Sequence, residues 1–522
     1  MFRFAPHRKR ILAAVLSLPL LLFALAILSS TRLRSKQLLL LSFNSESDGS
    51  VAASQIVNFS FKTADNGTDQ KAPYGAPFPD CVSLFENTSS PQFVQFAIDW
   101  TPPDKRSDRE VLAVTQNCTS FRQTYWFPSQ PKSLAESQFP LAYAILIHEQ
   151  PDQFFRLLQS IYWPQNLYCI HIDATSKVDV KRSVVAGASC FNNVVISNRA
   201  VNVQWGNYSV LEAALICLDD LLSHSKRYPW KYVQIYSGND FPLRSNAELV
   251  KIFQILNGSN DCELSPASGS RYVWSKTQIG NMTVNAGFRN VPPHNITLYK
   301  GSFQASLTHE FVKFARSDRR ALDLLAYLNG TTVPDETYWS TLIHNVHLNA
   351  PGNFPGSFSN FFVQIKLSIL AICRDYFNAI NAAKPHISRY QSWGFAKHNC
   401  NCSSCTMIKT RFLSKQIPAS QRSETRPSTR FHPCHSGKWS HGSCIFGVLD
   451  LPRLRRRREL AAHKFSADFQ PATLRCLAER VYNLTWSPSG SKTWSATPWH
   501  SYRRLPTVHY QRLTDKSQFN CV

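Results

Sequence analysis

The chain has 522 residues, of which 43% are hydrophobic, 17% charged and 12% aromatic. This composition can supply a large buried core, and it excludes a disordered or fibrous protein. Lysine and arginine number 57 against 34 aspartate and glutamate residues, a formal net charge of +23 that raises the question of an anionic partner.

The N-terminus has the pattern of a membrane anchor. A basic segment, residues 1–10, precedes an uninterrupted apolar run, residues 11–28. At about 1.5 Å per residue, a helix of this length approximately spans a bilayer. The pattern fits a signal anchor or a signal peptide, and the length of the run favours the anchor. We expect a cytoplasmic tail over residues 1–10 and a transmembrane signal-anchor over residues 11–28.

The rest of the chain has features of an oxidising lumen. Residues 29–80 are polar and lack periodicity, as in a flexible stem, and we expect a lumenal domain over residues 81–522. Fourteen cysteines, without paired zinc motifs, indicate disulfides. A lumenal location makes nucleic acid an improbable partner for the positive charge. Asn-x-Ser/Thr sequons occur at Asn58, Asn66, Asn87, Asn117, Asn207, Asn257, Asn281, Asn295, Asn329, Asn401 and Asn483.

From residue 141 onward, predicted strands and helices alternate. Apolar runs predict strands, and amphipathic segments predict helices between them. This alternation indicates an α/β fold with a mostly parallel sheet covered by helices, in which ligands bind beyond the carboxyl ends of the strands. The predicted strands are residues 141–147, 167–172, 194–197 and 232–236, and the predicted helices are residues 151–162 and 208–222.

Polar residues follow three of these strands: His148, Asp173 and the turn at residues 238–240. A strand-end aspartate is about as often a helix cap as a ligand contact, so the placement alone does not show whether Asp173 binds a ligand. The chain has no dinucleotide-binding, P-loop, nucleophile-elbow or zinc-protease motif. It also has no Asp-x-Asp triplet, which lumenal sugar-nucleotide enzymes use to hold a divalent cation, so we expect no metal cofactor.

Several stretches of the chain together resemble the core 2/I-branching β-1,6-N-acetylglucosaminyltransferases. The resemblance runs from about residue 81 to about residue 483, with its core at residues 140–483. It implies a GT-A-like fold and a Golgi type II membrane enzyme that transfers N-acetylglucosamine from UDP-GlcNAc, with inversion and without metal, to a 6-hydroxyl of a glycan containing galactose or N-acetylgalactosamine. The stretches that carry it are residues 140–173, 188–199, 238–246, 334–342 and 444–451.

The resemblance also implies roles for individual residues. Glu336 matches the general base that takes the proton of the acceptor hydroxyl. An alternative is that it only opens the following helix, where acidic residues are favourable. Lys464 matches one of two basic residues that receive the departing UDP. At the other position this chain has His441 where the family has arginine, and His441 would serve only when protonated.

The same resemblance implies which residues contact the UDP-sugar donor and which contact the acceptor glycan. Asp173, His148 and Trp205 match positions near the uridine and ribose, although Trp205 could equally be a packing residue. Glu263, Trp393 and Phe395 match acceptor-binding positions. The stretch over residues 263–271 is shorter than in the family and lacks its basic acceptor-contacting residues.

The family's disulfide positions are present as well. They imply the pairs Cys81 with Cys476, Cys118 with Cys190, Cys169 with Cys217, and Cys434 with Cys444. The pairing of Cys262, Cys373, Cys400, Cys402, Cys405 and Cys521 stays open; residues 400, 402 and 405 fit loop disulfides or, less well, a metal site.

Three alternatives remain open at this point. The chain could be the active transferase, a lumenal carbohydrate-binding relative without turnover, or an enzyme resembling the protein O-xylosyltransferases, which share the fold. The expected partners are a UDP-sugar donor, a glycan acceptor on glycoproteins, the membrane and, as a further possibility, a second copy of the chain.

Overall fold

The computed structural model describes residues 80–267, 269–279, 282–355, 386–392, 434–486 and 497–519. They all belong to the second of two compact units, Lys71–Val522. Within these residues, no helix combines the length and apolarity needed to cross a membrane. The predicted anchor over residues 11–28 lies outside them.

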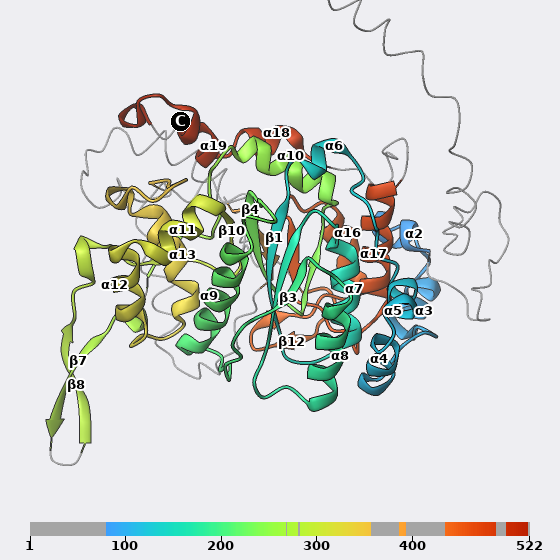
Figure 1. Ribbon diagram of the computed structural model, residues 1–522. Helices are drawn as coiled ribbons and strands as arrows, with labels where there is room; N and C mark the ends of the chain where they lie inside the picture. The colour runs from blue at the N-terminus through green and yellow to red at the C-terminus, as the bar shows by residue number, and fades with distance from the viewer. Residues whose placement is uncertain are drawn as a thin grey trace, which may run out of the picture. The chain divides into compact units, whose positions relative to one another are not determined.

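A five-stranded sheet forms the centre of the unit (Figure 1). Its strand order is β10-β4-β1-β2-β3, and the pairs β4/β1, β1/β2 and β2/β3 are parallel, while β10 is antiparallel to β4. The prediction of a mostly parallel sheet is therefore confirmed. The strands are β1 (Leu141–Ile147), β2 (Leu167–Ile172), β3 (Val194–Ile196), β4 (Tyr232–Ser237) and β10 (Ser306–Thr308).

Helices cover both faces of this sheet. On one face, α7 (Pro151–Ile161), α8 (Val178–Ser189) and α17 (Ala472–Trp486) share a core with β1, and on the other α9 (Tyr208–Ser223) and α13 (Tyr338–His344) do so. The remaining helices are α2 (Cys81–Glu86), α3 (Pro91–Asp99), α4 (Asp108–Thr115), α5 (Cys118–Tyr125), α6 (Leu134–Ser137), α10 (Asn246–Leu256), α11 (His309–Ser317), α12 (Arg319–Leu328), α16 (Leu451–Arg455), α18 (Trp499–Arg503) and α19 (Pro506–Arg512).

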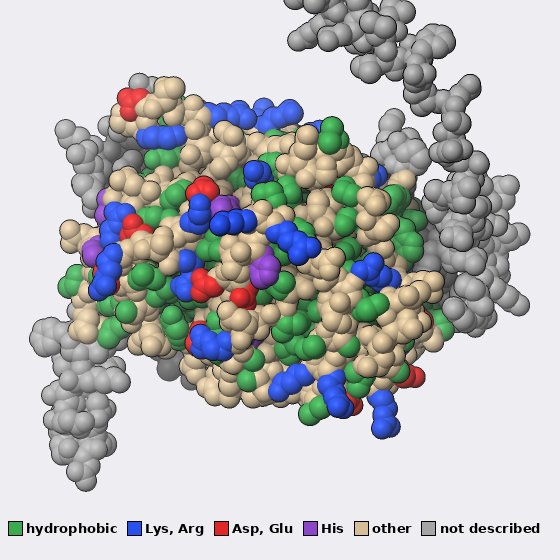
Figure 2. All heavy atoms as spheres, in the orientation of Figure 1, with side chains coloured by type: hydrophobic (Ala, Val, Ile, Leu, Met, Phe, Trp, Pro, Cys, Tyr) green, Lys and Arg blue, Asp and Glu red, His purple; other side chains and the backbone are tan. Residues whose placement is uncertain are grey.

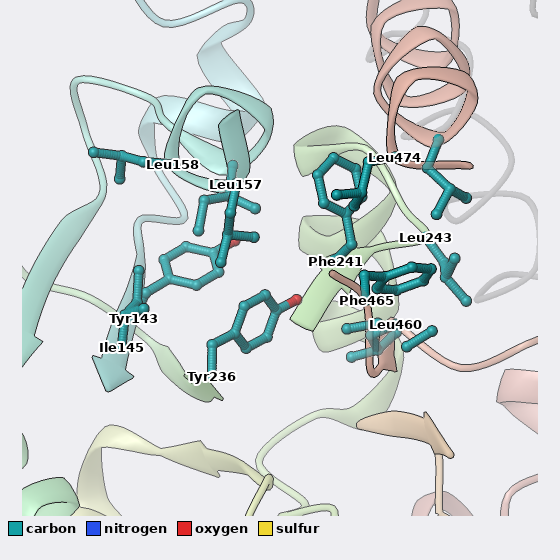
Figure 3. Packing of buried hydrophobic residues seen from close by; sticks show 14 of the residues in the cluster. Tyr143, Ile145, Leu157, Leu158, Tyr236, Phe241, Leu243, Leu460, Phe465 and Leu474 are labelled. Atoms are coloured by element: carbon teal, nitrogen blue, oxygen red, sulfur yellow. The ribbon is translucent and has the colours of Figure 1, made fainter. Parts of the chain in front are cut away.

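Strand β1 separates the two halves of the core. Because successive side chains of a strand point to opposite faces, Tyr143 and Ile145 pack on the α7 side, whereas Ala142 and Ala144 lie on the α9 side. Each fully buried large apolar side chain contributes about 1.5–3 kcal/mol. Figure 3 shows the α7-side cluster, in which Tyr143, Ile145, Leu157, Leu158, Tyr236, Phe241, Leu243, Leu460, Phe465 and Leu474 pack together.

A second, three-stranded sheet in the order β11-β14-β5 lies beyond the end of β4. Its strands are β5 (Asp240–Pro242), β11 (Arg389–Gln391) and β14 (Ala461–His463), with β14 parallel to β11 and antiparallel to β5. The register places His463 between Asp240 and Gln391. This sheet therefore joins three segments that are far apart in the sequence. The other strands form the pairs β6 (Ser265–Pro266) with β9 (Tyr299–Lys300), β7 (Trp274–Ile279) with β8 (Met282–Arg289), and β12 (Trp439–Ser440) with β13 (Ser443–Cys444).

Disulfides tie the periphery to the core. The bridges are Cys81–Cys476, Cys118–Cys190, Cys169–Cys217 and Cys434–Cys444, the same pairs that the resemblance implies. The first joins α2 to α17 across 395 residues of sequence, and the last closes the β12–β13 hairpin. Cys262 is a buried free thiol. The remaining cysteines lie outside the described residues.

Candidate active site

Two predicted donor-binding residues meet at the carboxyl ends of β1 and β2. His148 directly follows β1 and Asp173 directly follows β2, so the parallel register brings His148 Nδ1 to 4.0 Å from Asp173 Oδ1. The Asp173 carboxylate accepts hydrogen bonds from Thr175 N and Oγ1 and from Val203 N. Burial opposes ionisation, but these bonds and His148 outweigh it and lower the pKa of Asp173. The result is a fixed carboxylate beside an exposed imidazole.

Trp205 lies in the loop between β3 and α9, and the residue is 80% exposed. The loop is held at both ends, since Val203 N donates to Asp173 and Gly206 O accepts from Val333 N at 2.8 Å. Such exposure argues against a packing role for Trp205. The loop also links the donor-side Asp173 to the segment that leads to Glu336.

Lys464 and His441 come together on the hydroxyl of Ser440. Lys464 Nζ donates to Ser440 Oγ at 2.8 Å, and His441 Nδ1 lies 3.2 Å from the same oxygen. Burial lowers the pKa of Lys464, partly offset by the charge of Glu149. His441 is exposed and has a φ of 49° at the tip of the β12–β13 hairpin. The two residues predicted to receive the UDP diphosphate are therefore neighbours.

Glu336 ends the 3₁₀ helix η3 (Pro334–Glu336), immediately before α13. Its Oε2 accepts a hydrogen bond from Arg271 Nη2 at 2.7 Å and lies 3.8 Å from Lys300 Nζ. The side chain is 20% exposed, so solutes can reach it. Lys300 Nζ also lies 3.4 Å from Glu263 Oε2, and in this way a single cation joins the predicted base to a predicted acceptor-binding residue.

A buried network connects the Lys464–His441 pair with the Glu336–Glu263 pair. Asp240 Oδ1 lies 2.8 Å from His463 Nδ1 and 4.0 Å from Arg389 Nη1. Burial lowers the pKa of Arg389, and the charges of Asp240, Glu263 and Glu336 oppose that effect. Arg389 thus interacts electrostatically with the Glu336 side, while His463 is adjacent in sequence to Lys464.

Sequence reasoning missed most of these connecting residues. Arg271 ends the short stretch that was expected to lack basic acceptor contacts, yet it holds Glu336. Lys300 and Arg389 belong to no local motif, and only the tertiary fold brings them to the site, whereas Asp240 lies in the strand-end turn at residues 238–240 that the sequence already indicated. Trp393 and Phe395, the predicted aromatic acceptor contacts, lie outside the described residues.

Within the described ranges, one group of residues has the spacing of metal ligands, namely Cys434, Cys444 and Asp450. Its two sulfur atoms form a disulfide, so they cannot act as thiolate ligands. The site itself contains both cations and carboxylates, of which Glu263 and Glu336 share Lys300. Figure 2 shows such basic, acidic and histidine side chains interspersed over the middle of one face.

Fold and site together define an α/β protein whose charged residues converge beyond the carboxyl ends of parallel strands, where ligands bind in this class. The family model described as Core-2/I-Branching enzyme matches residues 141–400. A Mus musculus protein named N-acetyllactosaminide beta-1,6-N-acetylglucosaminyl-transferase is 31% identical over 72% of this chain and 80% of its own length. The chain belongs to the Core-2/I-Branching enzyme family.

Other relatives have related names. A Rattus norvegicus protein named beta-1,3-galactosyl-O-glycosyl-glycoprotein beta-1,6-N-acetylglucosaminyltransferase 3 is 34% identical, over 45% of this chain and 54% of its own length. The Homo sapiens protein of that name is 29% identical over 72% of this chain and 75% of its own length. The alignment with the rat relative therefore spans only about half of that protein.

Proposed function

We propose that this protein is an inverting β-1,6-N-acetylglucosaminyltransferase with a GT-A-like fold, which transfers N-acetylglucosamine from UDP-GlcNAc to a 6-hydroxyl of a glycan containing galactose or N-acetylgalactosamine. No divalent metal takes part. The names of the relatives support the reaction. The observation that carries the proposal is the partly exposed Glu336, which Arg271 and Lys300 hold in place beside Glu263.

In this mechanism Glu336 takes the proton of the acceptor hydroxyl as its oxygen bonds to C1 of N-acetylglucosamine. The bond from C1 to the phosphate oxygen breaks at the same time, and its electron pair leaves with UDP. Arg271 and Lys300 both approach Oε2 of Glu336, and within the described ranges Oε1 has no partner. Oε1 is therefore the atom that takes the proton.

Lys464 receives the negative charge that develops on the departing diphosphate. Asp173, His148 and Trp205 bind the uridine part, with the exposed indole of Trp205 stacking on the base. Glu263 accepts hydrogen bonds from hydroxyls of the acceptor, and Trp393 and Phe395 pack against its sugar faces. His441 is a further diphosphate contact.

The test uses the full-length chain, purified in detergent from animal cells. Wild type should transfer N-acetylglucosamine to an acceptor panel in the presence of EDTA, and linkage analysis should find β-1,6 products. Glu336→Gln should reduce transfer by about 10²–10⁴-fold while it retains affinity for UDP. Lys464→Ala should instead weaken UDP binding. Glu310→Gln, an exposed carboxylate on α11, is the matched control.

Other outcomes would contradict the proposal. Activity that vanishes with EDTA and returns with Mn²⁺ would refute metal independence. Binding of glycans without any transfer would favour the carbohydrate-binding relative, which the histidine at position 441 supports because it weakens the cationic site. Transfer from UDP-xylose to protein serine would favour the xylosyltransferase-like enzyme.

We further propose that the protein is anchored in the Golgi membrane by residues 11–28, with residues 29–80 as stem and residues 81–522 in the lumen. This arrangement follows from the N-terminal pattern, the cysteines and the sequons. The acceptors are then glycans on glycoproteins that pass through the same compartment. A homodimer is compatible with this arrangement.

A further inference from the structure

The Asp240–His463 pair takes no part in the steps above, although it lies next to Lys464. The Asp240 side chain is completely buried, and it accepts hydrogen bonds from Ser237 N, Ser237 Oγ and Gln304 Nε2 as well as facing His463. Burial alone would raise the pKa of Asp240, but His463, Arg389 and the Ser237 amide outweigh it and lower that pKa. Asp240 is therefore an ionised acceptor.

This protonation state fixes the tautomer of His463. An ionised carboxylate can only accept, so the ring must donate its Nδ1–H to Asp240 Oδ1 across 2.8 Å. Nε2 is then an acceptor in the neutral ring and a donor in the imidazolium. The side chain of His463 is 17% exposed, and in the described part of the chain Nε2 has no hydrogen-bond partner. It is available to a ligand.

The charges around His463 come from several elements. Asp240 on β5 favours the imidazolium, whereas burial, Arg389 on β11 and Lys464 beside it disfavour the imidazolium, and together they lower the pKa of His463. Ser237 at the end of β4 contributes a hydroxyl 3.5 Å from Nδ1. Without a ligand the ring is neutral near pH 7. An anion bound at Lys464 would neutralise one of the opposing charges and favour protonation.

We propose that His463 takes up a proton when UDP-GlcNAc binds and donates Nε2–H to a diphosphate oxygen, so that it provides a second cation beside Lys464. The inference rests on the proposed function. His441 is less suited to this role because it is exposed and, within the described ranges, no carboxylate bonds to its ring. The buried Asp240, in contrast, orients the His463 ring and balances its charge.

Proton uptake is the direct measurement. UDP-GlcNAc is titrated by calorimetry into the full-length chain in buffers of different ionisation enthalpy between pH 6 and 8.5. The phosphates of this probe lack the ionisation near pH 6 of a phosphomonoester, so they do not contribute protons. Wild type should take up close to one proton per nucleotide, and its affinity should fall by up to about tenfold per pH unit as pH rises.

Variants of individual histidines identify the residue that takes up the proton. His463→Gln should bind more weakly, without proton uptake and with little pH dependence, and His224→Gln, a matched histidine at the end of α9, should behave as wild type. Wild-type binding without proton uptake would overturn the inference even if His463→Gln fails to fold. Loss of the uptake in His441→Gln but not in His463→Gln would also overturn it. Absence of any UDP-GlcNAc binding or transfer would instead refute the proposed function itself.

Discussion

Asp335 and Glu336 are adjacent carboxylates in different surroundings. Glu336 is partly exposed and paired with Arg271, whereas the Asp335 side chain is buried and its Oδ1 has no hydrogen-bond partner among the residues that the structure describes. Burial, with a smaller contribution from the charge of Glu336, raises the pKa of Asp335 to about 7. Asp335 thus keeps its proton up to about pH 7, whereas the neighbouring Glu336 carboxylate has Arg271 and Lys300 as cationic partners.

This difference predicts a pH-dependent stability effect of Asp335→Asn. The pKa of Asp335 is higher in the folded than in the unfolded chain, so the folded protein loses stability as pH rises from about 4 to about 7. The neutral amide avoids this loss and should raise the free energy of unfolding by about 1–3 kcal/mol at pH 8. Thermal unfolding should show a Tm higher by about 1–3 °C at pH 8. An equal difference at pH 4 would contradict the assignment.

Gly301 allows three elements to approach one another around the site. It follows β9, and its amide donates to Glu336 O at 2.6 Å. A Cβ at this position would lie 2.7 Å from Glu263 O and 2.7 Å from Ser340 Cβ on α13. Real side chains do not approach so closely, so only glycine permits this spacing of Glu263 and Glu336.

Gly301→Ala should therefore separate the base from the acceptor-binding residue. We expect overpacking to cost about 1–3 kcal/mol and transfer to fall by about 10²-fold, because a shift near 1 Å is enough to misplace reacting groups. UDP affinity should change little, since Lys464 lies on a different segment. Gly330→Ala, whose nearest contact would be the Val273 side chain at 3.3 Å, is the matched control. Normal transfer by Gly301→Ala would show that the spacing is not critical.

The elements with local signals were predictable from the sequence. Apolar runs predicted β1 and β2 at their observed bounds, and the helix predicted at residues 151–162 is α7 (Pro151–Ile161). The second sheet was not predicted, because its strands have three residues each and β14 pairs with β5 across more than 200 residues of sequence. Arg389 and His463 reach the site only through that sheet, so long-range pairing hid part of the site from sequence analysis.

The net charge of +23 gives no uniform positive surface on the face seen in Figure 2, where acidic side chains lie among the more numerous basic ones. Much of the positive charge is also paired locally, as in the contacts of Arg156 with Asp152, Arg316 with Asp219 and Arg457 with Glu459. A mixed surface of this kind suits a neutral glycan acceptor. Under the proposed function, anion recognition then depends on local groups such as Lys464.

The proposed orientation of the chain in a membrane can be tested through its sequons. Basic residues flank the apolar run on both sides, so charge gives only a weak preference for orientation. The sequon asparagines exposed in the structure are Asn87, Asn117, Asn207, Asn257, Asn295 and Asn329. Exposed acceptors are modified only in the lumen, so a lumenal domain should be heavily glycosylated.

We expect the full-length chain from animal cells to lose mass in several steps on partial digestion with an N-glycan amidase. Asn87→Gln should remove one step, because this asparagine is exposed at the end of α2. In intact microsomes the large domain should resist added protease and become sensitive once detergent opens the membrane. A chain that carries no glycans and is digested without detergent would have its large domain in the cytosol, where UDP-sugar transfer to glycoproteins in the secretory pathway could not occur.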